Sequence, residues 1–238
     1  MDRATTWHRG TVPPAHTAWV DLHARIDDLQ REHTGSHIEG DIHQTAPFVE
    51  IFYSPLEGQE TRATLHRELE LSPAAQAIDA NPAYRSVLDG IVGSLPRTED
   101  APLQIRTKIV RNVHVYRGQG PDGVLMPHRD GFEYLATFCL GSQNMGGGNM
   151  QIWDLPPATL VEFHDDSMTT HFTSLEKPVA AVLNLPSTLG HGYVIDESRW
   201  DKAHTCAPFA PMDNNSPAYR DLLIIRASSL HAPSSFFD

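Results

Sequence analysis

Apolar residues in the N-terminal part of the chain recur at the spacing of an α-helix. Between residues 18 and 32 they lie three or four positions apart, which predicts one amphipathic helix. Two further helices are predicted to begin at Pro73 and Pro82, because each proline follows a residue that often caps helices, Ser72 or Asn81. Residues 1–17, with Pro13 and Pro14 and no periodicity, are expected to form an irregular arm over the surface. Residues 1–100 as a whole are expected to be mostly helical, and to supply support and the elements on the substrate side of the domain.

Beyond Pro102 the pattern changes to the alternation of a β-strand. From Gln104 to Val115, apolar residues fall on one side and polar residues on the other. Short apolar runs follow, separated by clusters of Gly, Pro, Asn and Asp. They are Leu135–Leu140, Met150–Trp153, Thr159–Phe163, Val179–Leu185, Tyr193–Ile195, Ala203–Phe209 and Leu222–Arg226. This spacing is typical of a sandwich or jelly roll, so residues 101–230 are expected to form a jelly-roll core within one domain, 1–238.

The composition narrows the class of protein. The formal net charge is -12 and the basic residues form no stripe, which argues against a partner that is a nucleic acid. No apolar run approaches the ~20 residues of a membrane span, and the N-terminus lacks the pattern of a signal peptide. A cytoplasmic protein that binds no membrane is therefore expected. Two isolated cysteines, Cys139 and Cys206, form neither a disulfide framework nor a zinc cluster. Nothing in the sequence indicates the oligomeric state.

The tripeptide His128-Arg129-Asp130 stands just before the apolar run Leu135–Leu140. Residues i and i+2 of a strand point to the same face, so an imidazole and a carboxylate can meet at one point. A second histidine would complete a site with two histidines and one carboxylate. Such a site leaves positions open on Fe(II) for a bidentate keto acid and dioxygen. His128 and Asp130 are therefore predicted metal ligands.

Two histidines compete for the position of the third ligand. His191 lies between glycines in an expected connection, where a ligand would be poorly held, whereas His204 begins an expected strand. His204 is preferred for this reason. Either residue could instead be a hydrogen-bonded structural histidine.

An arginine leads the last apolar run of the chain. A charged side chain that faces a protein core needs a partner of opposite charge. A carboxylate can compensate a guanidinium by accepting two parallel hydrogen bonds from it. Arg220 is therefore predicted to bind the 5-carboxylate of 2-oxoglutarate, or else to pair with a structural Asp or Glu. Arg226, farther along the run, is a weaker alternative.

Four segments resemble, in the same order, segments of bacterial 2-oxoglutarate/Fe(II)-dependent dioxygenases of the isoleucine-dioxygenase type. They are HRDG, GGGNMQIWD, GYVIDESRW with HTCAPF, and AYRDLLII, within roughly residues 104–226. Those proteins are amino-acid hydroxylases with a double-stranded β-helix. The resemblance implies that His128, Asp130 and His204 are the metal-binding triad and that Arg220 anchors the co-substrate. Arg117 resembles a position near the substrate, or is a surface arginine at the end of a strand.

The resemblance thus implies a mainly β fold with flanking helices and a jelly-roll, cupin-like core. It implies the cofactor Fe(II), the co-substrate 2-oxoglutarate, and the release of succinate and CO2. The partners would be O2 and a small substrate, such as a free aliphatic L-amino acid, that is oxidised at an unactivated C–H bond by hydroxylation, desaturation or ring formation. Two alternatives remain: a cupin-type metal enzyme that does not use 2-oxoglutarate, and a non-enzymatic jelly-roll binding module.

Overall fold

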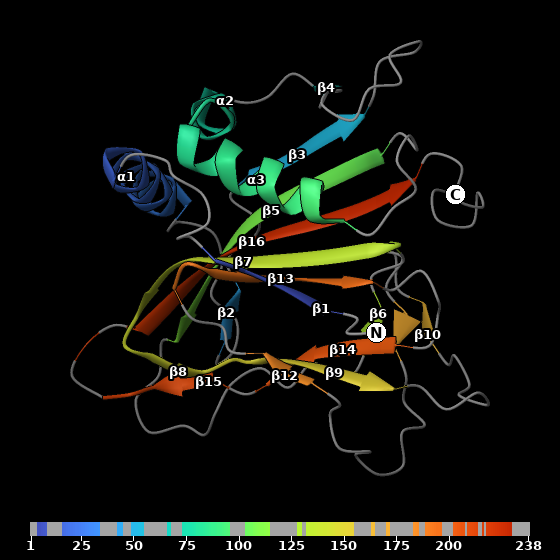
Figure 1. Ribbon diagram of the computed structural model, residues 1–238. Coiled ribbons are helices and arrows are strands. Elements are labelled where there is room, and N and C mark those ends of the chain that lie inside the picture. The colour runs from blue at the N-terminus through green and yellow to red at the C-terminus, as the bar shows by residue number, and fades with distance from the viewer. Residues whose placement is uncertain are drawn as a thin grey trace.

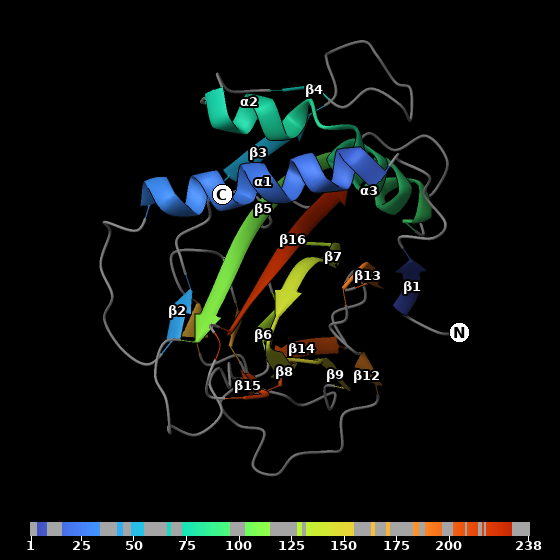
Figure 2. The same cartoon turned by 90° about the vertical axis from the view of Figure 1, so that its left-hand side faces the viewer.

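The computed structural model combines a layer of helices, a large antiparallel sheet and a smaller sheet (Figure 1, Figure 2). The residues that the structure describes are 4–8, 16–33, 42–44, 49–54, 66–67, 73–95, 103–114, 128–129, 132–154, 163–164, 170–171, 183–185, 189–196, 202–207, 209–213, 216 and 218–229. The described helices are α1 (His16–His33), α2 (Pro73–Asp79) and α3 (Pro82–Ser94).

The larger sheet has eight antiparallel strands. Its strands are β1 (Ala4–His8), β2 (Ile42–Gln44), β3 (Val49–Ser54), β4 (His66–Arg67), β5 (Leu103–His114), β7 (Tyr134–Gln143), β13 (His191–Asp196) and β16 (Ala218–Ser229). They are ordered β1-β13-β7-β16-β5-β3-β4, and β2 pairs separately with β5. The long central strands β5, β7 and β16 come from segments far apart in the chain.

The smaller sheet has six strands, ordered β10-β11-β6-β14-β9-β12. Its strands are β6 (His128–Arg129), β9 (Met150–Asp154), β10 (Phe163–His164), β11 (Thr170–His171), β12 (Leu183–Leu185) and β14 (Lys202–Cys206). A separate antiparallel pair is formed by β8 (Met145–Gly147) and β15 (Phe209–Pro211).

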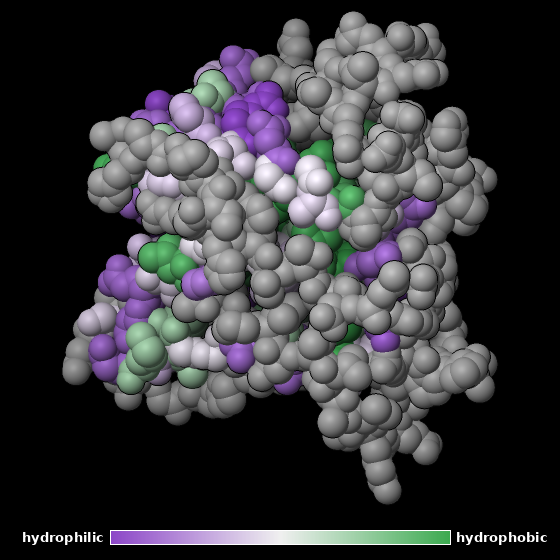
Figure 3. Space-filling view, in the orientation of Figure 1, coloured by the Kyte–Doolittle hydropathy of each residue, from purple (hydrophilic) through white to green (hydrophobic). Residues whose placement is uncertain are grey.

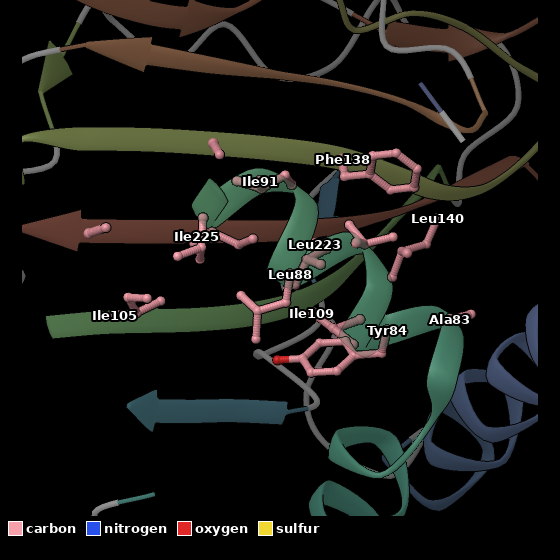
Figure 4. Packing of buried hydrophobic residues seen from close by; sticks show 14 of the residues in the cluster. Ala83, Tyr84, Leu88, Ile91, Ile105, Ile109, Phe138, Leu140, Leu223 and Ile225 are labelled. Atoms are coloured by element: carbon pink, nitrogen blue, oxygen red, sulfur yellow. The ribbon is translucent and has the colours of Figure 1, made fainter. Parts of the chain in front are cut away.

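The helices cover one face of the eight-stranded sheet, which we call the outer face. On α3, Tyr84, Leu88 and Ile91 are fully buried and point onto the central strands (Figure 4). Trp19 of α1 stacks on Phe138 of β7, with ring centroids 6.1 Å apart. Hydrophilic residues gather on the opposite side of the helical layer, at the upper left of the space-filling view (Figure 3). These helices are therefore amphipathic, with the apolar side toward the sheet.

Asn81 fixes both the start of α3 and its position against α1. Its side-chain oxygen accepts hydrogen bonds from the backbone N–H groups of Ala83 and Tyr84, at 2.8 and 3.3 Å. Its amide nitrogen donates to the carbonyl of Ala18 and to Asp21 on α1. The capping residue predicted from the Asn-Pro pair thus also connects two helices.

The smaller sheet lies toward the opposite face of the eight-stranded sheet, which we call the inner face. Ile152 of β9 packs there in a cluster with residues of the larger sheet. The remaining members are Leu135, Ile195, Met150 and Ile224. Because side chains alternate along a strand, positions 220, 222, 224 and 226 of β16 share the inner face with Ile224.

The predicted fold class is confirmed: the chain is mainly β, with antiparallel sheets consistent with a jelly roll and a few flanking helices. The prediction of an irregular arm in residues 1–17 is wrong for Ala4–His8, which forms β1 and pairs with β13. The first hundred residues were predicted to be mostly helical. They contain the three described helices, but they also contribute β2, β3 and β4 to the larger sheet. Among the described residues, no helix has both the length and the apolar composition that crossing a bilayer requires.

Candidate metal and co-substrate site

Two of the predicted metal ligands lie directly opposite each other in the smaller sheet. His128 on β6 and His204 on β14 are register partners. Their ring centroids are 4.3 Å apart, and the ring planes are inclined by 58°. Register partners of an antiparallel pair project to the same side, so the ladder itself brings the imidazoles together. Both side chains are buried, with 9% and 3% of their surface exposed.

The imidazoles project from the side of the smaller sheet that faces the larger one. Ile152 is the second register partner of His204, so its side chain points the same way. Ile152 belongs to the apolar cluster on the inner face. Any ion held by the two histidines would therefore lie between the sheets, next to apolar side chains that exclude water.

The structure describes His191 but not the other two candidates named from the sequence. Asp130 and Arg117 lie outside the described residues. His191 begins β13 in the larger sheet, where its register partner is His8, so the expectation that it lies in a connection is wrong. The structure brings His204, and not His191, into register with His128.

Arg220 extends from the inner face of β16 toward the smaller sheet. It is only 2% exposed. Its Nη1 donates a hydrogen bond of 2.6 Å to the carbonyl of Gly148, and its Nη2 lies 3.4 Å from Sγ of Cys206. Cys206 follows His204 by two positions on β14, so both side chains share one face of that strand. The guanidinium therefore lies on the histidine side of the smaller sheet.

Gly148 leaves the space that this arginine needs. A Cβ atom at this position would overlap Nη1 and Cζ of Arg220. The residue also has a φ of 69°, in the left-handed region that glycine adopts without strain. The glycine run that precedes β9 thus has a steric role beside Arg220, which the sequence did not indicate.

Arg111 on β5 holds β16 from the outer face. Its Nε and Nη2 donate to the two carboxylate oxygens of Asp221, at 2.6 and 2.8 Å. Its Nη2 also donates to Asp27 of α1 at 2.7 Å, and its Cζ lies 4.3 Å from the ring centroid of Tyr219. These contacts of Arg111 were not predicted from the sequence. The available signal was a charged residue at an apolar position of the alternation in β5.

Burial shifts the pKa of two groups around Arg220. It raises the pKa of the Cys139 thiol to about 11, while the nearby charge of Arg220 acts in the opposite direction. Burial also raises the pKa of the Asp221 carboxyl, and the hydrogen bonds from Arg111 oppose this shift. Cys139 is therefore a protonated, unreactive thiol at neutral pH.

The described residues fit a ferrous site with two nitrogen donors. Imidazole nitrogen suits Fe(II), and a site with two histidines and one carboxylate keeps coordination positions open. Within the described part of the chain, no three His, Cys, Asp or Glu side chains gather at one point. The predicted carboxylate ligand, Asp130, lies outside that part. The adjacent buried guanidinium suits a carboxylate, such as the far end of a bound keto dicarboxylate.

Solved structures similar to this chain support the fold. One is a structure described as IDO from Bacillus thuringiensis, with 11% identity, a TM-score of 0.62, and coverage of 96% of this chain and 94% of that one. Another is the Fe(II)/α-ketoglutarate-dependent dioxygenase TqaL, with 17% identity, a TM-score of 0.55, and coverage of 96% and 83%. A bsmA homolog from Methylobium petroleophilum PM1 has 15% identity, a TM-score of 0.51, and coverage of 95% and 89%.

No curated protein sequence matches the chain significantly. The sequence model described as 2OG-Fe dioxygenase matches residues 52–226. This match covers most of the chain, including both adjacent histidines and Arg220. It decides against the two alternatives, a metal enzyme that does not use 2-oxoglutarate and a non-enzymatic binding module. The chain belongs to the 2OG-Fe dioxygenase family and is an oxidoreductase that uses Fe(II) and 2-oxoglutarate.

Proposed function

We propose that this dioxygenase hydroxylates an unactivated C–H bond of a free aliphatic L-amino acid or a close derivative. In the overall reaction one oxygen atom of O2 enters the substrate as hydroxyl, and the other enters the succinate that forms from 2-oxoglutarate as CO2 is lost. Fe(II) with 2-oxoglutarate supplies the oxidising chemistry when bound. The domain that carries this function spans residues 1–238.

The observation that carries the proposal is the direct pairing of His128 with His204 on the side that faces the larger sheet. We assign these two histidines and Asp130 as metal ligands. The backbone ladder fixes the imidazoles relative to each other, and the apolar cluster beside them keeps bulk water away. In this proposal the role of the chain is to hold the metal ligands in fixed positions, to shield the reacting centre from water and to orient the target carbon.

We assign Arg220 as the residue that binds the 5-carboxylate of 2-oxoglutarate. Its burial and its contacts with Gly148 and Cys206 place the guanidinium near the strand that carries His204. A buried guanidinium presents two parallel N–H groups to a carboxylate, and charge-assisted bonds of this kind contribute about 1.5–3 kcal/mol.

The amino-acid substrate rests on the sequence resemblance to hydroxylases of the isoleucine-dioxygenase type. The apolar cluster supports an aliphatic substrate, because one of its members, Ile152, is the register partner of His204. Succinate release in the presence of individual aliphatic amino acids tests this choice. Stimulation by none of them, but by a substrate of another class, would refute the amino-acid assignment and leave the dioxygenase family unaffected.

Anaerobic titration of the apo-protein with Fe(II) and 2-oxoglutarate tests the ligand set. The wild type should develop the visible charge-transfer band of the chelate. His128→Ala and His204→Ala should lose this band, and His191→Ala should retain it. Loss of the band in His191→Ala alone would show that the distal ligand is His191. Arg220→Gln should raise the 2-oxoglutarate concentration for half-saturation by roughly ten- to a hundredfold, and an unchanged value would remove that role.

A further inference from the structure

The thiol of Cys206 joins the buried guanidinium of Arg220 to the backbone of Gly148. Nη2 of Arg220 donates to Sγ of Cys206 at 3.4 Å, and Nη1 donates to the carbonyl of Gly148 at 2.6 Å. The same carbonyl lies 3.5 Å from Sγ, and the carbonyl of Ala207 lies 3.4 Å from it. A thiol can accept one hydrogen bond and donate its hydrogen to another group. Cys206 therefore closes a triangle of polar contacts with the guanidinium and the Gly148 carbonyl.

The main chain fixes this thiol relative to the Gly148 carbonyl. Cys206 is the register partner of Met150 on β9. The N–H group of the next residue, Ala207, donates to the carbonyl of Asn149 at 2.7 Å. Asn149 directly follows Gly148 in the chain, so the end of β14 is attached to the backbone segment that carries this carbonyl. The ladder between β14 and β9 thus sets the place from which the thiol meets the arginine.

A thiol can orient the guanidinium without adding a negative charge beside it. An aspartate or glutamate in place of Cys206 would form charge-assisted hydrogen bonds with Arg220. Such a residue would compete directly with a bound carboxylate for the same N–H groups. Sulfur in a thiol is a weak acceptor without a formal charge, so its contact sets the direction of Nη2 and does not compete in this way.

Cys206 also places the guanidinium close to the paired histidines. His204 and Cys206 are two positions apart on β14 and share one face, which corresponds to about 7 Å along the strand. In the proposed complex, 2-oxoglutarate extends from a metal held at His204 to the guanidinium of Arg220. Charge-assisted hydrogen bonds need donor–acceptor distances of about 2.7–2.9 Å. A small displacement of the guanidinium would therefore weaken its bonds to the far carboxylate.

We propose that Cys206 is a positioning residue that sets the orientation of Arg220 and thereby the affinity for 2-oxoglutarate. The thiol acts through the guanidinium and requires no contact with the metal. This inference rests on the proposed function, in which Arg220 binds the 5-carboxylate, and it gives a role to the second of the two cysteines.

The test compares two keto acids that differ only at their far end. 2-Oxoglutarate carries the distal carboxylate, and 2-oxopentanoate carries a methyl group in its place. Binding of each to the protein loaded with Fe(II) is measured under anaerobic conditions from the visible band of the chelate. Cys206→Ala should weaken the binding of 2-oxoglutarate roughly three- to tenfold and leave that of 2-oxopentanoate within about twofold. Cys206→Ser keeps a donor and an acceptor, and it should recover most of this loss.

A double variant tests whether the cysteine acts through the arginine. In the Arg220→Gln background, Cys206→Ala should cause no further loss of 2-oxoglutarate affinity, because the guanidinium that it orients is absent. Cys139→Ala is the matched control. The Cys139 thiol is also buried near the charge of Arg220, but its Sγ donates to the carbonyl of Gly141 at 3.5 Å. This variant should bind 2-oxoglutarate within about twofold of the wild type.

Urea unfolding shows whether each variant is folded before its affinities are compared. If Cys206→Ala does not fold, Cys206→Val takes its place, because valine fills the space of the thiol without its hydrogen bonds. Any of four results would overturn the inference. They are unchanged 2-oxoglutarate affinity in Cys206→Ala, equal weakening of both keto acids, no recovery in Cys206→Ser, and additive losses in the double variant.

Failure of the proposed function gives a different result. If Arg220→Gln alone binds 2-oxoglutarate as tightly as the wild type, Arg220 is not the co-substrate arginine, and the inference falls together with that assignment. If Arg220→Gln is impaired and Cys206→Ala is not, the assignment of Arg220 stands and only the role of Cys206 is refuted.

Discussion

Arg111 forms a bidentate ion pair with Asp221, on the face of β16 opposite to the one from which Arg220 projects. The same guanidinium lies over the ring of Tyr219. Tyr219 and Asp221 are the two chain neighbours of Arg220. Arg111 on the outer face therefore contacts the residues on both sides of Arg220, which itself points to the inner face. Arg111 also donates a hydrogen bond to Asp27, which links the group to α1. The position of Arg220 thus depends on the docking of a helix on the far side of the sheet.

Asp221→Asn should weaken both the fold and the binding of 2-oxoglutarate. The substitution removes the charge that compensates a buried guanidinium, and breaking such a pair costs about 3–5 kcal/mol. Unfolding in urea would measure this loss. The KM for 2-oxoglutarate should rise several-fold with little change in kcat. Tyr84→Phe, which acts on the same helical layer away from Arg220, is the control. An unchanged KM in Asp221→Asn would show that the ion pair only stabilises the fold.

Gly148→Ala should displace Arg220 while leaving the histidines in place. The added methyl would overlap the guanidinium, and the positive φ would strain the backbone. Affinity for 2-oxoglutarate, measured by calorimetry, should fall by roughly tenfold or more if the charge-assisted bonds are lost. Binding of Fe(II) alone should persist.

Gly93→Ala is the matched control for this substitution. Gly93 lies in α3, and a Cβ there meets nothing within 4 Å. Alanine should stabilise the helix by about 0.5–1 kcal/mol and leave 2-oxoglutarate binding unchanged. Equal 2-oxoglutarate affinities in the two alanine variants would contradict the steric role of Gly148.

The hydrogen bond between Tyr84 Oη and Thr107 Oγ1 joins α3 to β5 at 2.8 Å in a buried position. Tyr84→Phe should lower the free energy of unfolding by about 1–3 kcal/mol, because it removes a buried hydrogen-bond partner of Thr107. The double variant with Thr107→Val should recover part of this loss. Denaturant unfolding of the two single variants and the double variant gives the coupling energy. A coupling energy of zero would mean that the bond does not contribute.

The buried thiol of Cys139 should make stability depend on pH in the alkaline range. Burial raises its pKa from 9.0 to about 11, so the folded state holds the proton more tightly than the unfolded state. The resulting stabilisation is complete below about pH 9 and is lost as the pH rises toward 11. Thermal unfolding between pH 8 and 11 should show a smaller decline in Cys139→Ala than in the wild type. Parallel declines would rule out this contribution.

Elements with local signals were predictable from the sequence. The helix with Trp19 and Leu22 follows from its periodic apolar positions, and α3 follows from Asn81 before Pro82. The strand β1 was not predictable, because a strand this short has no periodicity of its own and is defined by its pairing with β13. Tertiary pairing decides such segments.

The candidate site likewise contains residues that could be proposed from the sequence and contacts that could not. His128, His204 and Arg220 could be proposed from residue types and order, since their chemistry is visible in the sequence. The contacts of Gly148 and Arg111 could not, because they depend on a close approach between distant segments. His191 was expected to lie in a connection, because glycines flank it in the sequence. The structure instead places it at the start of β13, a strand that pairs with β1 and β7, which are distant in the chain.

The cross-strand pairing of His128 with His204 separates two properties that could otherwise interfere with each other. Pairing between the main chains sets the spacing of the two imidazoles, so that spacing is fixed by the sheet itself. If the two imidazoles hold the iron, substitutions on other strands should alter which compounds the protein accepts without moving this pair, which would suit it to engineering for new substrates.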